Sequence, residues 1–282
     1  MLYYLHIPKS AGTSVRELFQ QVYGKKLVEV YGRMEPAYVE SLKPLCHKDS
    51  VLFGHYSFSL HVRMGDPEPQ YMTILRNPID RVVSWYKGKI RDPKEQHAER
   101  ILRDRLTLAE AIELGFAPEL NNHSVRVLTG RGRRPILKLK HRALNVYSSR
   151  LRGKQIYQYN AQRYLDTAIA NLNRYFCFVG IVERMDQLTQ FMAERGDLTG
   201  ADAIMPRANV APPQDVKIDS QTLEVIRKAN ELDMALYEMV AGKLRAGESW
   251  YPLQPLSRSL LRRVAVSRLS IPGPGIARGV SP

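Results

Sequence analysis

The chain has 282 residues, of which 44% are hydrophobic, so it can bury a sizeable core in one large domain or two small ones. Its formal net charge of +14 indicates an anionic ligand or partner, but the charge alone does not separate a nucleotide, an acidic glycan and a nucleic acid. The two cysteines, Cys46 and Cys177, exclude a disulfide framework and a cysteine-based metal site, and we expect both to be buried free thiols.

The chain begins with a predicted strand, a loop and a helix. Residues 3–7 are an apolar run typical of a buried parallel strand, and Pro8 ends the run because proline has no N–H for a sheet. After the loop, Thr13 or Ser14 is the expected N-cap of a helix whose apolar face is Val15, Leu18, Phe19 and Val22. A helix N-terminus in this setting favours a bound anion, most often a phosphate.

The loop of this unit differs from the Walker A motif. Lys9 stands at its start and Gly12 is its single glycine, whereas Walker A has two glycines and places its lysine at the end of the loop. A magnesium nucleotide is therefore not the first expectation. The alternative to an anion site is an ordinary turn with a solvated lysine.

The next segments predict further strands of one sheet. We expect strands at residues 26–31 and 51–53, with a short helix within residues 35–45 between them. A strand at residues 71–75 then leads through Asn77 and Pro78 into a helix whose inward face is Ile79, Val82, Val83 and Tyr86.

This second junction carries its own candidate anion ligands. Arg76 stands at the carboxyl end of its strand, where ligands bind in open α/β sheets, and its guanidinium group suits a phosphate. Ser84, two helical turns further on, can add a hydroxyl group. The alternative is that Arg76 pairs with Asp80 in an ordinary surface arrangement.

Together the two junctions resemble the nucleotide-binding motifs of sulfotransferases that use 3′-phosphoadenosine 5′-phosphosulfate (PAPS). The stretches are HIPKSAGTS at residues 6–14 and ILRNPIDRVVSWY at residues 74–86, and the closer similarity is to the carbohydrate branch that includes heparan sulfate 2-O-sulfotransferase. The spacing of eight from Arg76 to Ser84 matches the family and implies that both bind the 3′-phosphate. The resemblance also implies that the 5′-phosphosulfate is surrounded by Lys9, Ser10, Ala11, Gly12, Thr13 and Ser14.

The segment after the third strand adds a candidate base. Residues 54–58, GHYSF, resemble a segment of the sugar 2-O-sulfotransferases in which the matching histidine is the catalytic base. A histidine, with an ordinary pKa of about 6.5, suits removal of a hydroxyl proton near neutral pH. We expect His55 to be this base and Lys9 to stabilise the leaving phosphate, with no metal. The alternatives are a structural His55, a role for His61 beside the acceptor, and an acidic base.

Two later segments bear on the acceptor. Residues 121–130 resemble the family's N-x-x-x-R-x-L-x-G segment near the cleft, which implies that Asn122 and Arg126 face the acceptor; a plain amphipathic helix with a glycine C-cap is the alternative. Residues 131–154 carry nine Lys or Arg and no Asp or Glu. We expect residues 131–160 to be a basic loop or insertion, either solvated or forming a rim for an anionic acceptor such as an acidic glycan.

The remaining elements are mainly packing elements. Thr107 and Glu110 have the spacing of a capping box. Arg207 is a cofactor candidate, because residues 207–209 resemble a late family segment near the nucleotide. The basic tail, residues 252–282, is expected to pack little. We predict helices at residues 161–174, 183–196 and 219–245, and a buried strand at residues 175–182.

The expected architecture is one α/β domain over residues 1–251, with a P-loop-like three-layer fold and a mostly parallel sheet between helices. The expected reaction moves the sulfuryl group of PAPS to a hydroxyl of a carbohydrate or glycolipid acceptor and leaves PAP. No apolar run of about 18 residues and no signal peptide are evident, so we expect a cytoplasmic enzyme, or a Golgi-lumen enzyme if the sequence is trimmed.

Two other functions stay open from the sequence. One is a P-loop-type kinase or nucleotide hydrolase on a related fold, which needs a Walker lysine and a magnesium carboxylate. The other is a basic nucleic-acid-binding protein without catalysis, which the motifs disfavour. The sequence leaves open whether the chain forms a homo-oligomer.

Overall fold

The structure is a computed structural model of the chain. It describes residues 1–31, 34–95, 97–130, 152–198, 218–248 and 250, and for residues 152–160 it describes the helical backbone alone. All of these residues belong to one compact unit, Met1–Pro252. Arg207, most of the basic segment and the tail from residue 251 onward lie outside the described residues.

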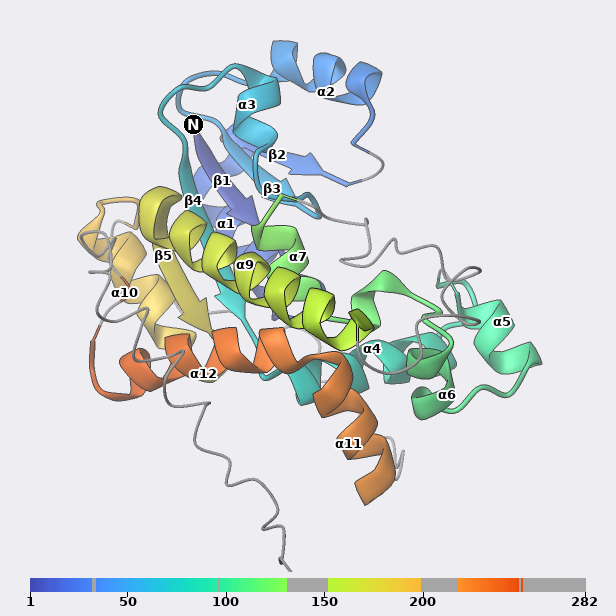
Figure 1. The fold of residues 1–282 in the computed structure, drawn as a ribbon. Coiled ribbons are helices and arrows are strands. Elements are labelled where there is room, and N and C mark those ends of the chain that lie inside the picture. The colour runs from blue at the N-terminus through green and yellow to red at the C-terminus, as the bar shows by residue number, and fades with distance from the viewer. Residues whose placement is uncertain (32–33, 96, 131–151, 199–217, 249, 251–282) are drawn as a thin grey trace, which may run out of the picture. The chain divides into compact units, whose positions relative to one another are not determined.

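The centre of the unit is a five-stranded sheet in which every pair of neighbouring strands is parallel (Figure 1). Its strand order is β2-β3-β1-β4-β5, and Tyr3 of the central strand pairs with Leu52 on one side and Tyr71 on the other. The α/β architecture predicted from the sequence is thereby confirmed. The strands are β1 (Leu2–Leu5), β2 (Leu27–Val30), β3 (Val51–Gly54), β4 (Gln70–Leu75) and β5 (Phe176–Ile181).

Helices surround the sheet, as its buried strands require. Figure 1 shows α9 and α12 crossing the sheet close to β5, and both helices contact that strand. The helices are α1 (Gly12–Tyr23), α2 (Pro36–Leu42), α3 (Leu60–Met64), α4 (Pro78–Arg91), α5 (Ala98–Arg103), α6 (Leu108–Glu113), α7 (His123–Leu128), α9 (Arg152–Tyr175), α10 (Asp186–Glu194), α11 (Ser220–Ala229) and α12 (Glu231–Arg245), with 3₁₀ turns at Gly24–Lys26, Lys43–Leu45, Pro118–Leu120 and Val182–Arg184.

The alternation of side chains along each strand divides the core between the two faces of the sheet. One face packs against α1 and α10 in a cluster that includes Tyr4, Phe53 and Met72. The residues between them point to the opposite face, where the rings of Tyr3 and Tyr71 stack with centroids 4.8 Å apart. A separate apolar cluster joins α4, α5, α6 and α11.

Several predicted boundaries are confirmed and others are wrong. Thr107 and Glu110 form the predicted capping box of α6, because the Thr107 hydroxyl accepts from the Glu110 N–H and the Glu110 carboxylate accepts from the Thr107 N–H. Helix α9 begins at Arg152 rather than at residue 161, so it takes in the end of the predicted basic loop. Both cysteines are free but half-buried.

The predicted helix over residues 219–245 is two helices. Asn230 separates α11 from α12, with φ −122° and ψ 28°. Its side chain has other partners: Oδ1 accepts from the Asn122 N–H, and Nδ2 donates to the carbonyls of Leu120 and Ile226. The apolar periodicity continues through the break, which is why the sequence pattern did not reveal it.

The strand order places a topological switch point between β1 and β4. From β1 the chain crosses toward β2 and β3, whereas from β4 it continues to β5 on the other side. Ligands of open α/β sheets bind in the crevice outside the carboxyl ends of strands at such a point. The loop after β1 carries Lys9 and the junction after β4 carries Arg76, so both predicted anion motifs flank this crevice. Among the described residues, no helix is long and apolar enough to cross a membrane.

Candidate active site

The loop between β1 and α1 has an unusual backbone conformation. Lys9 and Ala11 both adopt left-handed conformations, with φ 70° and φ 57°, which non-glycine residues seldom take. Helix α1 then begins at Gly12, and the first N–H groups of a helix have no intrahelical acceptor. Turns of this kind form anion-binding concavities, and the helix dipole adds to them.

The predicted cap of α1 is wrong. Ala11 is the N-cap and offers no side-chain hydrogen bond, while Thr13 and Ser14 lie within the first helical turn. The left-handed turn at Ala11 starts the helix two residues earlier than a Thr13 cap would allow, and three earlier than a Ser14 cap would. Both hydroxyl residues therefore stay beside the loop, Thr13 half-buried and Ser14 buried.

Arg76 connects the two motifs directly. Its Nη1 donates a hydrogen bond of 3.0 Å to the backbone carbonyl of Lys9. The predicted alternative, an Arg76–Asp80 ion pair, is not found among the ion pairs of the described residues. Asn77 caps α4 by accepting from the Ile79 N–H at 2.9 Å, and this cap fixes the direction in which the helix leaves the strand. Ser84 is half-buried on α4.

Lys9 lies among other cations. Burial lowers the pKa of its ammonium, nearby Glu95 opposes that shift, and Lys89, Arg91 and Arg76 lower the pKa further. An anion bound at the loop would raise the pKa of Lys9 again, because it would pair with the buried charge and offset the repulsion between the cations. The charge distribution therefore favours an anionic ligand at this loop.

Three buried polar atoms at the loop have no hydrogen-bond partner among the described residues. They are Oγ of Ser10 and both ring nitrogens of His6. Buried polar atoms are usually paired, so unpaired ones at a loop of this shape indicate a place for a ligand or water. Burial is also the main reason that the pKa of His6 lies well below its ordinary value, with His55 and Lys9 as further causes, so the imidazole is neutral.

Gly12 is required by the position of His6. A Cβ atom added at Gly12 would lie 1.8 Å from Nε2 of His6, which no side chain tolerates. His6 thus packs directly on the first residue of α1. Residues 3–7 were predicted as the first strand, but β1 ends at Leu5 and His6 begins the loop.

His55 occupies the equivalent place on the neighbouring strand. It follows β3 directly, its backbone N–H donates to the carbonyl of Val30 at 3.1 Å, and its side chain is exposed. Its ring centroid is 4.5 Å from that of His6 and 5.1 Å from that of Tyr31, whose plane is nearly perpendicular at 89°. The predicted base therefore stands one strand away from the Lys9 loop.

A line of side chains follows the carboxyl edge of the sheet. Tyr31, His55, His6 and Arg76 are each the first residue after their strand, in the spatial order β2, β3, β1 and β4. The predicted anion ligands, Lys9 and Arg76, follow β1 and β4, and the exposed imidazole and Tyr31 follow β3 and β2. Tyr31 was missed by the sequence analysis, because one aromatic residue at the end of a strand carries no motif.

His61 is not brought to this edge. It is buried on α3, its Nδ1 lies 2.9 Å from the hydroxyl oxygen of Tyr71, and its backbone N–H donates to that oxygen at 3.2 Å. Tyr71 is near the start of β4, at the opposite end of the strand from Arg76. Burial lowers the pKa of His61, so this imidazole is neutral as well.

Asn122 and Arg126 have structural partners. Asn122 is the N-cap residue of α7, and its Oδ1 accepts from the backbone N–H groups of Leu232 and Asp233 at 2.9 and 3.1 Å. Arg126 is 2% exposed, and its guanidinium donates to the carbonyl of Pro118. The expectation that both face an acceptor is not supported by these contacts, because each side chain is used to join buried elements.

These two residues belong to a buried polar network between α4, α7 and α12. The Asp233 carboxylate accepts from the N–H groups of Ser124 and Val125, both at 2.9 Å, and lies 3.6 Å from the Arg81 guanidinium. Arg81 also donates to the carbonyl of Glu119 at 2.8 Å. Burial lowers the pKa of Arg81 while Asp233 opposes that shift. Within the network, Nε of Arg81 and of Arg126 are unpaired.

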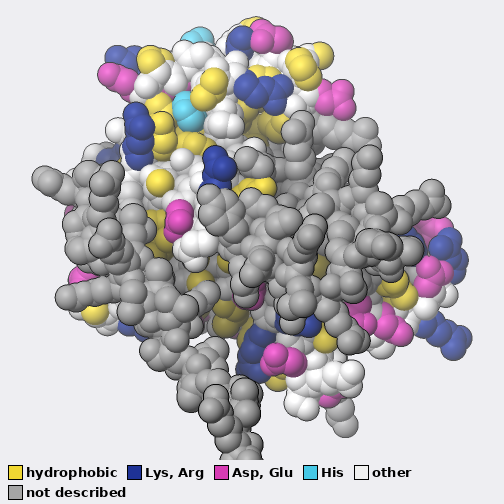
Figure 2. All heavy atoms as spheres, in the orientation of Figure 1, with side chains coloured by type: hydrophobic (Ala, Val, Ile, Leu, Met, Phe, Trp, Pro, Cys, Tyr) yellow, Lys and Arg dark blue, Asp and Glu magenta, His cyan; other side chains and the backbone are white. Residues whose placement is uncertain are grey.

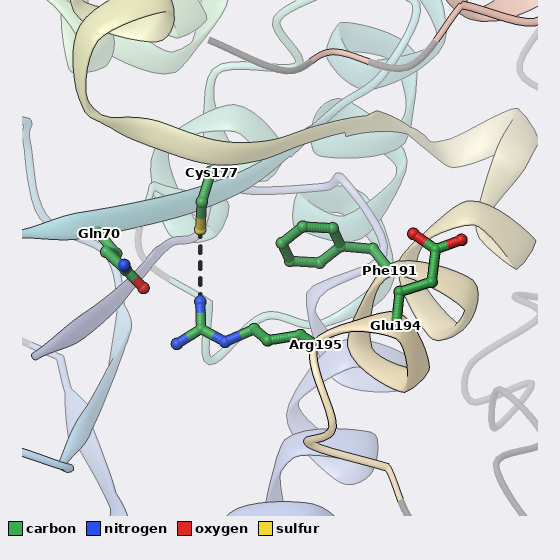
Figure 3. Close-up of a pocket in the computed structure, with 5 residues that line it drawn as sticks. All are labelled: Gln70, Cys177, Phe191, Glu194 and Arg195. Carbon is green, nitrogen blue, oxygen red and sulfur yellow. Dashed lines mark hydrogen bonds between the residues drawn. The ribbon is translucent and has the colours of Figure 1, made fainter.

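A hollow of about 470 Å³ lies elsewhere (Figure 3). It is lined by Gln70, Cys177, Phe191, Glu194 and Arg195, and the Arg195 guanidinium donates to Sγ of Cys177 at 3.6 Å. Gln70 and Cys177 are at the starts of their strands, so this hollow is at the edge of the sheet opposite the Lys9 loop. Burial raises the pKa of the Cys177 thiol to about 11, which makes it a poor nucleophile.

Figure 2 shows one face of the molecule. On its described part, Lys and Arg side chains are scattered among acidic and hydrophobic ones and do not form a continuous basic surface. Within the described residues, no group of three or more His, Cys, Asp or Glu is placed to hold a metal ion.

Comparisons with known proteins agree with the motifs. Residues 1–239 match the model of the sulfotransferase family. Among solved structures, the chain is similar to mouse sulfotransferase SULT7A1 complexed with PAP, with 14% sequence identity and a TM-score of 0.43 over 94% of this chain and 88% of the other. No curated protein matches the chain.

Proposed function

The chain belongs to the sulfotransferase family, and from this premise we propose that it transfers the sulfuryl group of PAPS to a hydroxyl of a carbohydrate acceptor. The observation that carries the proposal is the hydrogen bond from Arg76 to the Lys9 carbonyl. It joins the two motifs at the switch point of the sheet, where an anionic nucleotide would contact both. We place the catalytic domain in residues 1–251.

The residues at the edge of the sheet fit such a donor. PAPS carries anionic groups at both its 3′ and 5′ positions. The loop offers Lys9, the N-terminus of α1 and the unpaired Ser10 hydroxyl for the 5′-phosphosulfate. Arg76 and Ser84 lie across the crevice on the β4 side and are proposed to hold the 3′-phosphate. Arg207 stays a candidate ligand that lies outside the described residues.

In the proposed reaction, the residue after β3 activates the acceptor and the loop after β1 stabilises the leaving group. PAPS supplies a sulfuryl group whose bond to the phosphate oxygen breaks as the acceptor oxygen attacks sulfur in line, leaving PAP. A ring nitrogen of His55 takes the proton of the attacking hydroxyl. The Lys9 ammonium and the N–H groups of the loop stabilise the negative charge that develops on the departing phosphate.

The acceptor side is the part of the edge that β3 and β2 form. His55 is exposed there, and the Tyr31 side chain beside it is 39% exposed. The resemblance of residues 54–58 to the sugar 2-O-sulfotransferases supports a carbohydrate or glycolipid acceptor. An aromatic ring with an apolar face and a polar tip suits an acceptor that has both CH faces and hydroxyl groups.

Transfer from radiolabelled PAPS tests this proposal. The acceptors would be desulfated heparin, chondroitin, a neutral glycolipid and 4-nitrophenol, and the enzymes would be the wild type and His55→Ala. We expect transfer to a carbohydrate and a loss of 10²-fold or more in kcat for His55→Ala, as is usual for a general base. His47→Ala is the matched control, because His47 is exposed on a loop, and it should retain full activity.

Two outcomes would contradict parts of the proposal. Transfer to 4-nitrophenol alone would exclude a carbohydrate acceptor. Unchanged transfer by His55→Ala would show that another group is the base, while leaving the sulfuryl transfer itself in place.

A further inference from the structure

Helix α4 contains a glycine, Gly88, that the helical backbone does not require. Gly88 lies in the third turn of a fourteen-residue helix and is buried, and its backbone dihedral φ is not positive. Glycine is less favourable than alanine inside a helix, because it loses more conformational freedom on folding. A buried interior glycine therefore calls for a neighbour that needs the space of a side chain.

That neighbour is the lysine of the donor loop. A Cβ atom added at Gly88 would lie 2.9 Å from Nζ and 3.4 Å from Cε of Lys9. The ammonium group of Lys9 thus lies close to α4 at Gly88 and takes up space that a methyl group there would need. Ser84 lies four residues earlier on α4, on the same face of the helix.

An ion pair lies beside this contact. Lys89, the next residue of α4, is 7% exposed, its Nζ lies 2.5 Å from Oε2 of Glu95, and it also stands 5.2 Å from the centre of the Trp85 ring. Contacts with Glu95 and Trp85 therefore hold the Lys89 side chain in place, and the ion pair in turn holds the Glu95 carboxylate in its position. Glu95 is the acidic group that acts on the Lys9 charge, against the three cations nearby.

We propose that Gly88 and the Lys89–Glu95 ion pair form a seat for the Lys9 ammonium, and that Gly88 is a positioning residue for donor binding. The seat holds the ammonium on the face of α4 that also carries Ser84, between the loop and the second motif. The glycine makes the close approach sterically possible, and the Glu95 carboxylate offsets part of the cost of burial and of the repulsion from the nearby cations. The claim about donor binding rests on the proposed function, whereas the seat itself does not.

The consequence of a methyl group at residue 88 follows from these distances. Lys9 is a flexible side chain, so its ammonium would move out rather than break the helix. It would leave the reach of Glu95 and the face it shares with Ser84. The helix itself would tolerate alanine, because alanine is the residue that helices favour most.

Two measurements on the same four variants test the seat and its function. The first is a heteronuclear NMR titration of protein labelled with ¹³C-lysine, in which the Lys9 Cε resonance is assigned by its loss in Lys9→Ala. The second is calorimetric titration with PAP. The variants are Gly88→Ala, Lys9→Ala, the double variant, and Gly242→Ala as the matched control, because Gly242 is also inside a helix and a Cβ there would meet nothing within 4 Å.

We expect Gly88→Ala to move the Lys9 resonance to the position of exposed lysines and to raise the pKa of Lys9 toward its ordinary value. PAP affinity should fall about tenfold in Gly88→Ala, as for partial loss of one charge-assisted contact. It should not fall further when Gly88→Ala is added to Lys9→Ala, because the effect passes through Lys9. Gly242→Ala should change neither measurement.

An unchanged Lys9 resonance in Gly88→Ala would overturn the seat. A displaced Lys9 with unchanged or improved PAP affinity would overturn the positioning role, and so would an equal loss in both backgrounds, which would mean that Gly88 acts through the helix backbone. If the wild type itself binds no PAP, the proposed donor and the positioning role both fail, while the NMR titration still decides the seat.

Discussion

Helix α4 serves two groups of polar residues that differ in how their charges are balanced. At its start, Arg76 connects to the Lys9 loop, where the Ser10 hydroxyl and both nitrogens of His6 lack partners among the described residues. Five residues further on, Arg81 enters the buried network, where the Asp233 carboxylate accepts two backbone N–H groups and faces the guanidinium. In the first group, the open cluster, Lys9 is close to three other cations. In the second group, the closed network, Asp233 balances the charge of Arg81, and the unpaired atoms are Nε of Arg81 and of Arg126.

This difference predicts that one group of residues on α4 determines stability and the other determines ligand binding. Closed networks hold elements together, and removing one partner leaves a buried charge or dipole without compensation. Open clusters are left with unpaired atoms and mutual repulsion that a ligand can relieve. Variants of the Asp233 network should therefore change the free energy of unfolding, and variants of the Lys9 loop should change ligand affinity.

The largest expected effect is from Asp233→Ala. This change leaves the fully buried Arg81 without its counter-charge and the start of α7 without its acceptor. Breaking a buried ion pair costs about 3–5 kcal/mol, and urea unfolding measures the loss. Asp233→Asn is a milder second variant that keeps the size of the side chain. A loss below 1 kcal/mol for Asp233→Ala would show that the network is not what joins α7 to α12.

A smaller effect is expected from Asn122→Ala, which sharpens the comparison because sequence similarity placed Asn122 at the acceptor. The variant leaves the N–H groups of Leu232 and Asp233 without their acceptor. We expect the free energy of unfolding to fall by about 1–3 kcal/mol, while acceptor KM and PAP affinity stay unchanged. A raised acceptor KM in a variant of normal stability would restore Asn122 to the acceptor site.

The smallest effect concerns pH, and it involves two buried histidines, His6 in the Lys9 loop and His61 outside both groups. Burial lowers the pKa of His6 in the open loop and of His61 beside Tyr71. As the pH falls below about 6.5, the unfolded chain protonates these imidazoles before the folded protein does, so stability falls with pH. Each group adds a slope of at most about 1.4 kcal/mol per pH unit.

Urea unfolding between pH 7.5 and 5 checks this slope. His6→Phe and His61→Phe should each flatten it, and His47→Ala, on an exposed loop, should leave it as it is. A slope that is the same in all three variants would mean that neither buried imidazole resists protonation in the folded protein.

Much of the fold follows from local patterns. The apolar run at residues 71–75 lies in β4, the run at residues 175–182 contains β5 (Phe176–Ile181), and the Thr107 capping box starts a helix, because in these places local preference and tertiary packing agree. The break at Asn230 could not be foreseen, because it depends on hydrogen bonds to Asn122 and Leu120, which are more than a hundred residues away in the sequence. The start of α1 depends on the left-handed turn at Ala11, which no residue preference indicates.

The candidate site was predictable where a motif carried it. Lys9 and Arg76 were placed by their strand-to-helix junctions, and the structure brings these junctions together. His6 and Gly88 could not be assigned from the sequence, because their significance lies in what touches them: Gly12 and His55 for the first, Lys9 for the second. The acceptor role that similarity assigns to Asn122 and Arg126 stays a prediction, and their contacts join buried elements instead, because polar residues of a buried network can resemble those of a binding site.

Calorimetric titration with PAP, with AMP as the comparison, tests the central claim most directly. We expect PAP to bind without magnesium and at least tenfold more tightly than AMP, because only PAP carries the 3′-phosphate that Arg76 is proposed to hold. Arg76→Ala should remove this difference without lowering the melting temperature by more than a few degrees. If PAP and AMP bind alike to the wild type, or if neither binds, the open cluster between β1 and β4 is not the donor site.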